Sequence, residues 1–194
     1  LVKEQLPDVP AENILAEPCA RNTAPCIAFA AAVIGRKYDD AVMLVLPSDH
    51  LIGYENIYIK TLKKAVSVAE NGKNLVTIGI TPTYPETGYG YIQVGEKVDG
   101  DICRVKTFTE KPKLELAKVF LETGEFFWNS GIFLWSAKTI IRELIANAPD
   151  VANVFEKGRH LFGTSAERQF IEENFPGCVG ISIDFAVMEK AKNV

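Results

Sequence analysis

The chain has 194 residues, 47% of them apolar, and a formal net charge of −4 at pH 7. This length and apolar content predict one domain over residues 1–194 with a sizeable core. The acidic balance argues against a nucleic-acid partner, and no apolar run approaches the roughly 20 residues that span a membrane.

The four cysteines predict neither a zinc site nor disulfides. Cys19, Cys26, Cys103 and Cys178 form no CxxC pair and match no common zinc spacing. Each lies in an apolar or strand-like setting, where a free thiol usually packs as a small hydrophobe. Because the chain also starts without a signal peptide, we expect reduced thiols in a cytoplasmic protein.

The first half of the chain alternates between strand-like and helix-like segments. A short strand at 13–16 and an Ala-rich helix at 24–36 are followed by the run 41–46, which is apolar on both faces. A helix at 56–71 and a second buried strand at 75–80 come next. Strands buried on both faces are typical of a parallel sheet between helices, so this rhythm predicts an α/β fold with a mostly parallel sheet.

The second half continues as one mixed α/β unit. It opens with a hairpin or meander after Gly88. The expected strands are 89–94, 102–108, 131–135 and 179–183. The expected helices are 113–122, 137–148 and two within 151–174, and residues 186–191 follow the last strand.

Asp49 comes just past the carboxyl end of the predicted strand 41–46. Ligands of open parallel sheets bind at that edge, and a carboxylate there, beside Ser48 and His50, could hold Mg²⁺ against phosphate oxygens. On position alone, a turn aspartate that caps the next element is the simpler interpretation. His50 is better explained by packing or hydrogen bonding.

The segment EPCARNTAP joins a predicted strand to the helix 24–36. Asn22 or Thr23 can cap this helix, whose free N–H groups would also favour a phosphate. Glu17 could accept hydrogen bonds from the two adjacent donors of a guanine edge, and Arg21 could contact phosphate. Helix capping with a surface ion pair explains the same residues without a ligand.

Three further segments carry polar groups that suit a sugar phosphate. Gly90, in GYGY, permits a close ligand or a bulge. Glu110 could accept from sugar hydroxyls while Lys111 neutralises a phosphate, although EKP is also a common surface turn. Asn129 and Ser130 could bind hydroxyls, or Asn129 could serve a turn.

Taken together and in order, these segments resemble one enzyme family. EPCARNTAPCIA, VMLVLPSDHLI, PETGYGYI, FTEKP, FWNSGIFLW and SIDFAVMEK are similar to the motifs of mannose-1-phosphate guanylyltransferases, and the likeness runs from about Ile14 to Lys190. The resemblance implies a Rossmann-like nucleotidyltransferase fold. It also implies transfer of GMP from GTP to mannose 1-phosphate, with Mg²⁺, to give GDP-mannose and pyrophosphate.

The resemblance assigns roles by position. It implies that Asp49 is a catalytic residue and the metal ligand, and that Lys111 is the second catalytic residue. The implied nucleotide-binding residues are Glu17, Arg21, Asn22, Thr23 and Ser48. The implied sugar-phosphate residues are Gly90, Glu110, Lys111, Asn129 and Ser130. Asp184 lies in the late motif SIDFAVMEK without an assigned contact.

Two family motifs have no counterpart in the chain. The glycine-rich N-terminal phosphate loop and a late metal-binding aspartate motif are absent, and the first residue is not Met. We therefore expect that the sequence is truncated at both ends and that the chain alone is inactive. Because such a chain would expose strand edges, a homo-oligomer is a possible partner state. Another sugar-nucleotide pyrophosphorylase and a non-catalytic sugar-nucleotide-binding module remain the alternatives.

Overall fold

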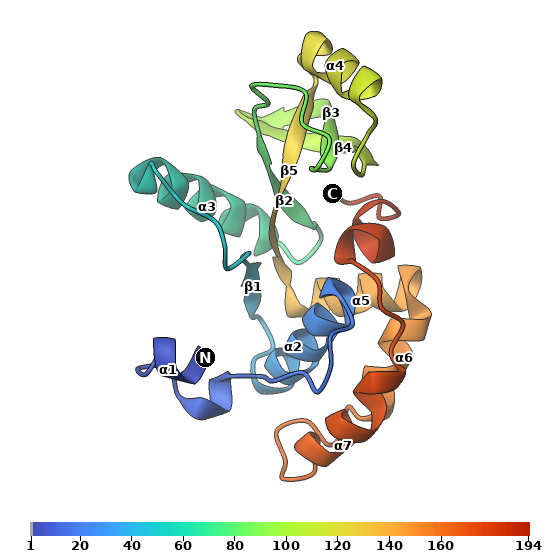
Figure 1. Ribbon diagram of the computed structural model, residues 1–194. Coiled ribbons are helices and arrows are strands. Elements are labelled where there is room, and N and C mark those ends of the chain that lie inside the picture. Colours follow the sequence, from blue (N-terminus) through green and yellow to red (C-terminus); the bar gives the residue numbers. More distant parts are fainter. Residues whose placement is uncertain (1) are drawn as a thin grey trace.

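The structure, a computed structural model, describes residues 2–194 and has a long central strand, β5, around which the other elements are arranged (Figure 1). The strands are β1 (Val42–Val45), β2 (Val76–Ile80), β3 (Tyr91–Asp99), β4 (Ile102–Thr109) and β5 (Phe126–Ser136). The α-helices are α1 (Val2–Gln5), α2 (Thr23–Lys37), α3 (Glu55–Ala69), α4 (Leu114–Thr123), α5 (Ala137–Asn147), α6 (Pro149–Lys157) and α7 (Glu167–Asn174). Single turns are η1 (Ala11–Asn13) and η2 (Phe175–Gly177), of 3₁₀ type, and η3 (Asp184–Met188), a π-helical turn.

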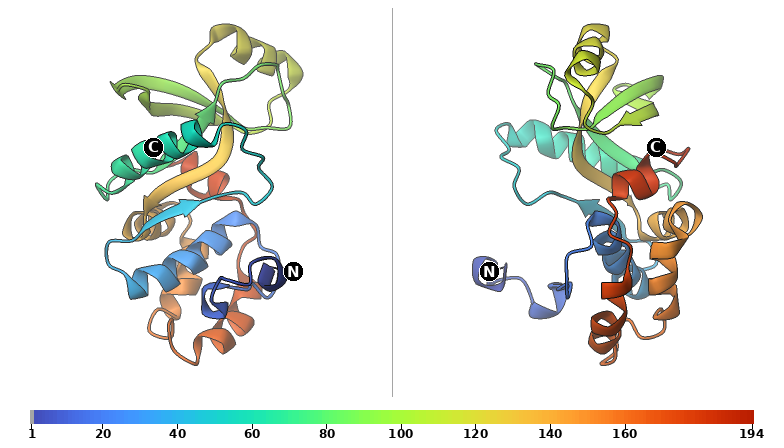
Figure 2. Two further views of the ribbon diagram at one scale, coloured as in Figure 1. Left: turned by 90° about the vertical axis from the view of Figure 1, so that its left-hand side faces the viewer. Right: turned by 45° about the vertical axis from the view of Figure 1, so that its right-hand side comes forward.

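The helices lie at both ends and on the sides of β5. Helices α2, α5, α6 and α7 gather at one end of this strand, and α4 lies beyond the other (Figures 1 and 2). Helix α3 and the C-terminal segment lie on opposite sides of the sheet. The expected α/β fold with helices around a sheet is therefore confirmed. None of the helices in residues 2–194 is both long and apolar enough to cross a membrane.

The prediction of a mostly parallel sheet is wrong for the described strands. β1 and β2 both pair antiparallel with β5 at Phe133 and Leu134, so they occupy its two opposite edges. β3 pairs antiparallel with β5 at 126–128 and with β4. The two strands that the βαβ rhythm suggested do run in one direction. They do not pair with each other, because β5, from much later in the chain, lies between them.

The expected burial of β1 and β2 on both faces is also wrong. Helix α3 packs on Val42, but Leu44, which lies on the same face of the strand, is 39% exposed. Leu46 and Ile80 are 47% and 46% exposed. Among the described residues, α3 thus covers only part of this face.

The main core lies on the other face, between the sheet and the helices at the end of β5. Helix α2 begins where sequence predicts, since Asn22 caps it and Pro25 lies in its first turn. Its Phe29 ring contacts the rings of Phe155 in α6 and Phe175 in η2. These contacts join segments that are far apart in the sequence and pack the middle of α2 against α6 and η2.

Two predicted strands are irregular in the structure. Residues 13–16 and 179–183 pair with no strand of the described sheet. Instead, the Ile181 carbonyl accepts a 3.0 Å hydrogen bond from the Ala24 N–H at the start of α2. The backbone of 179–183 therefore forms a hydrogen bond with a helix and not with a strand, which holds the late motif against α2.

Candidate active site

Asn129 lies where β5 is paired on both sides, and it connects Gly90, on the predicted sugar side, with the late motif. Its backbone N–H donates to the Gly90 carbonyl at 2.8 Å. Its side-chain Oδ1 accepts from the Gly131 N–H at 3.2 Å and from the Thr77 hydroxyl at 3.4 Å. Its Nδ2 donates to Asp184 Oδ1 at 2.7 Å. The tertiary structure thus brings the late motif to the sugar side.

Glu110 reaches over Gly90 because this position has no side chain. A Cβ on Gly90 would lie 2.5 Å from Glu110 Oε2 and 3.7 Å from Asn129 Nδ2, and the first distance is too short for any real Cβ. Glycine at this position therefore makes room for the carboxylate. Gly90, Glu110 and Asn129, which are predicted from separate motifs, meet at one point of the sheet.

Lys111 is paired with Glu110 in the turn that follows β4. Its ammonium lies 3.2 Å from Glu110 Oε1, and the two side chains are 64% and 25% exposed. The backbone of Lys111 has φ +46°, a conformation that side chains other than glycine adopt at some cost. An exposed ion pair of this kind stabilises little. The lysine is therefore available to an anion that competes with Glu110.

Ser130 lies beside Asn129, but its hydroxyl is turned into the sheet. It donates to the Ile78 carbonyl at 2.6 Å and accepts from the Ile132 N–H at 3.2 Å. The residue is 8% exposed. The Ser130 hydroxyl therefore has no donor left for a sugar hydroxyl, and only one acceptor lone pair remains for the predicted contact.

Burial and like charges set the electrostatics around Asp184. Burial raises the pKa of Asp184, the hydrogen bond from Asn129 opposes this, and the Glu110 charge adds to it. Burial, followed by the charges of Asp184 and Glu110, likewise raises the pKa of Glu189. Sequence reasoning missed Glu189. The sequence offered no signal beyond the place of Glu189 in SIDFAVMEK. The π turn, in which its N–H bonds to the carbonyl of Asp184 five residues earlier, brings the two residues together.

The predicted nucleotide segment is tied to the same late motif. Asn22 has φ +66°, and its side chain accepts from the Thr23 N–H at 2.8 Å. The Thr23 hydroxyl in turn accepts from the Ile183 N–H at 2.8 Å. Since the N–H of Ala24 is also bonded, two of the N–H groups expected to favour a phosphate are already engaged within the protein.

Glu17 and Arg21 retain buried polar atoms without partners. Arg21 donates to the Pro176 carbonyl, yet its Nε is buried and has no hydrogen-bond partner among the described residues. Glu17 Oε1 is buried and unpaired in the same sense. Cys26 is exposed as a residue, but desolvation of its sulfur, and then the charge of Glu17 and a hydrogen bond to it, raises the pKa of the Cys26 thiol to about 11. Buried polar atoms are normally paired, so these two residues have capacity for a polar ligand or for water.

Asp49 lies in an exposed turn after β1. The ring of Pro47 would lie 3.4 Å from a Cβ on Gly131, so this turn abuts the segment that begins at Asn129. No group of three or more His, Cys, Asp or Glu residues within 2–194 could hold a metal ion. A single carboxylate nevertheless suits Mg²⁺, which is commonly held by one or two carboxylates together with substrate phosphates and water.

Two hollows in the surface lie away from these residues. One, of about 290 Å³, lies between α2, α5 and α6, and the other lies along α3. None of the predicted site residues lines either of them. The contacts among Gly90, Glu110 and Asn129, and not either hollow, bring these predicted residues together.

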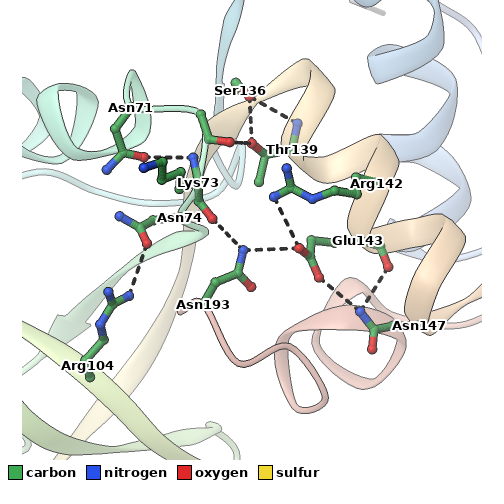
Figure 3. A network of polar contacts seen from close by, with 11 residues as sticks. Asn71, Lys73, Asn74, Arg104, Ser136, Thr139, Arg142, Glu143, Asn147 and Asn193 are labelled. Atoms are coloured by element: carbon green, nitrogen blue, oxygen red, sulfur yellow. Dashed lines mark hydrogen bonds and ion pairs between the residues drawn. The ribbon is translucent and has the colours of Figure 1, made fainter.

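A polar network fixes the chain that follows η3 (Figure 3). The Asn193 side chain donates to the Lys73 carbonyl at 2.7 Å and to Glu143 Oε1 at 3.1 Å. The Asn193 carbonyl accepts from the Leu75 N–H at 3.0 Å. Together with the bond from Ile183 to Thr23, these contacts hold the segment that carries Asp184 and Glu189 at both ends.

Residues 2–162 match the nucleotidyl transferase family. Among curated relatives, a mannose-1-phosphate guanylyltransferase of Sinorhizobium fredii is 44% identical over 199 residues, which cover 100% of this chain and 38% of the relative. A mannose-1-phosphate guanylyltransferase of Escherichia coli is 42% identical and is matched over 93% of this chain and 40% of its own. The chain spans about two fifths of the length of these relatives.

Two solved structures resemble the fold. A Thermus thermophilus protein described as a mannose-1-phosphate geranyltransferase superposes with a TM-score of 0.81 at 35% identity, over 93% of this chain and 50% of its own. A Helicobacter pylori protein described as a mannose-6-phosphate isomerase gives 0.75 at 32% identity, over 91% of this chain and 68% of its own.

Proposed function

The chain belongs to the nucleotidyl transferase family, and from that premise we propose that the full-length protein carrying it transfers GMP from GTP to mannose 1-phosphate. The products are GDP-mannose and pyrophosphate. The relatives with 42–44% identity support this substrate pair. The observation that carries the proposal is the meeting of Gly90, Glu110 and Asn129 on the sheet, with Lys111 paired beside them.

The sugar phosphate binds at this meeting point. The carboxylate of Glu110 accepts hydrogen bonds from sugar hydroxyls, and the amide of Asn129 donates one. Lys111 neutralises the phosphate. Its ion pair with Glu110 is weak and exposed, so the ammonium readily exchanges Glu110 for the phosphate. An ammonium, as a mobile point charge, suits this task.

The guanine base binds at the segment that contains Glu17. The unpaired carboxylate oxygen of Glu17 supports this assignment, because the N1–H and the exocyclic amine of guanine are two adjacent donors. Arg21 contributes its unpaired Nε to the same ligand. Asn22 and Thr23 contribute by fixing the segment against residue 183.

The reaction needs positioning and charge neutralisation rather than a general base. An oxygen of the sugar phosphate, already anionic, forms a bond to the α-phosphorus of GTP, and the bond between the α- and β-phosphates breaks to release pyrophosphate. Asp49, with Ser48 beside it, would hold Mg²⁺, which supplies charge neutralisation at the nucleotide phosphates. Lys111 provides the corresponding positive charge on the sugar phosphate.

Pyrophosphate release by the full-length protein tests the proposal. GTP should be assayed with mannose 1-phosphate and Mg²⁺ and compared with ATP, UTP and dTTP, and with glucose 1-phosphate. Turnover only with another nucleotide or another sugar phosphate would change the proposed substrates but leave the proposed type of reaction standing. Tight binding of GDP-mannose without turnover would identify a binding module. Conversion of mannose 6-phosphate without any pyrophosphate release would favour an isomerase.

A further inference from the structure

The hydrogen bonds of Asn129 leave its side chain with one unused donor. An asparagine amide offers two N–H donors and two acceptor lone pairs on oxygen. Both lone pairs face donors, those of Gly131 and Thr77, and one N–H donates to Asp184. Among residues 2–194, nothing accepts from the second N–H.

The carboxylate of Asp184 and the Gly131 N–H together decide which way the amide faces. An ionised carboxylate only accepts hydrogen bonds, and the Gly131 N–H only donates. In one of its two orientations the amide therefore makes both hydrogen bonds, to Asp184 and from Gly131, and in the flipped orientation it makes neither. In the favoured orientation Nδ2 lies on the side of Gly90, where the Glu110 carboxylate also reaches. A donor and an acceptor are thus presented next to each other.

The backbone around Asp184 is fixed well enough to serve this purpose. The Ile183 N–H is bonded to Thr23, and Ala186, Val187 and Met188, two to four residues after Asp184, are at most 1% exposed. A side chain is positioned most reliably when its own backbone is held by packing and hydrogen bonds. Asp184 therefore works from a rigid support.

We propose that Asp184 is a positioning residue, whose carboxylate turns the Asn129 amide so that its remaining N–H, beside Glu110, is presented to a hydroxyl of the sugar phosphate. This inference rests on the proposed function only in taking a sugar phosphate as ligand. It gives Asp184 a role through another residue and needs neither a metal ion nor a direct contact with the substrate. The alternative is a purely structural bond between β5 and η3.

An exchange of the two side chains separates these roles. In the double variant Asn129→Asp with Asp184→Asn, the new amide at 184 donates to the new carboxylate at 129, which can still accept from Gly131 and Thr77. The bond between β5 and η3 is restored, but position 129 no longer has an N–H to offer. Asp184→Ala removes the bond, and Asp184→Asn keeps it because the amide oxygen can accept.

These variants should be made in the full-length protein and compared for steady-state kinetics and thermal unfolding. Asp184→Ala should raise KM for mannose 1-phosphate about tenfold, the size expected for one lost hydrogen bond, with KM for GTP within about twofold. Asp184→Asn should stay within about threefold of the natural protein. The exchange variant should recover the unfolding temperature to within about 2 °C while KM remains raised about tenfold.

Several results would overturn the inference. An exchange variant with normal KM would mean that the Asn129 N–H is not used, and the bond would then be structural. An Asp184→Asn variant as impaired as Asp184→Ala would make the charge itself essential. If Asp184→Ala does not fold, the other two variants still decide. These outcomes leave the proposed function intact, whereas a natural protein that neither binds nor converts any sugar phosphate would refute both proposals.

Discussion

The Asn129 amide in β5 donates a 2.7 Å hydrogen bond to the Asp184 carboxylate in η3, 55 residues further along the chain. The residue before Asp184 is bonded to Thr23 at the start of α2. Two adjacent residues of the late motif therefore join the proposed nucleotide segment to the proposed sugar segment. This relationship makes the late motif part of the candidate site and not only of the fold.

Asp49→Asn in the full-length protein should lower kcat by about 10²-fold or more, because an amide is a poor replacement for an anionic Mg²⁺ ligand. The turn is exposed, so the free energy of unfolding should change by less than about 0.5 kcal/mol. Steady-state kinetics over a range of Mg²⁺ concentrations and urea unfolding measure the two effects. Asp40→Asn, at a fully exposed side chain, is the matched control. Unchanged turnover would remove Asp49 from the metal role.

Lys111→Ala should raise KM for mannose 1-phosphate at least about tenfold and leave KM for GTP nearly unchanged, since it removes a charge-assisted contact to one substrate. Because φ at this position is +46°, Lys111→Gly should lose the same activity but unfold with about 1 kcal/mol more free energy than Lys111→Ala. Lys113→Ala, two residues on, controls for the loss of a nearby charge. Equal KM values for mannose 1-phosphate in the natural protein and both variants would rule out this contact.

Gly90→Ala should displace Glu110, because the added Cβ would lie 2.5 Å from Glu110 Oε2. We expect a loss of stability of about 1–3 kcal/mol, as in other overpacked sites, together with impaired use of the sugar phosphate. Gly53→Ala, where a Cβ meets nothing within 4 Å, should be close to neutral. Urea unfolding and kinetics with varied mannose 1-phosphate test both parts. A fully active and stable Gly90→Ala variant would mean that the Glu110 carboxylate does not need this space.

Asp184→Asn should stabilise the protein more at pH 7 than at pH 4, relative to the natural chain. Burial raises the pKa of Asp184 above its ordinary value of 3.8, so the folded state holds this proton more tightly than the unfolded state does. The free energy of unfolding then falls as pH rises through the window between the unfolded and folded pKa values, and the variant lacks this fall. Urea unfolding of both proteins at the two pH values measures the difference. If the advantage of the variant shrinks toward pH 7, the pKa of Asp184 is lowered instead.

Although Cys26 is exposed to solvent, its thiol should react slowly with iodoacetamide, because its raised pKa keeps it protonated. A pKa of about 11 against the ordinary 9.0 reduces the thiolate fraction near pH 8 about a hundredfold, and the thiolate is the reactive form. Glu17→Gln should speed the labelling, though not to the rate of a free cysteine, because burial is the larger cause of the shift. Mass spectrometry of the labelled peptide follows this one site. Equal labelling rates in the natural protein and the Glu17→Gln variant would mean that Glu17 does not affect the pKa of the Cys26 thiol.

The local elements were predictable because their signals are local. The predicted helix 24–36 agrees with α2, Thr23–Lys37, to within one residue at each end, since a cap, a proline in the first turn and an apolar run are all read from neighbouring residues. The helix 137–148 and the hairpin after Gly88 are confirmed for the same reason. The pairing of the strands was not predictable, because β5, which lies between β1 and β2, begins more than 80 residues after β1 and more than 45 after β2.

The sequence by itself determined which residue types stand at each loop, and the resemblance of its motifs pointed to the nucleotidyl transferase family to which the chain belongs. Only the tertiary structure decided how those residues meet. It placed Glu110 over Gly90, turned Ser130 into the sheet, and bonded Asn129 to Asp184. Helices and turns follow from short-range periodicity and capping, whereas side-chain partners depend on strand register and packing between segments distant in the chain.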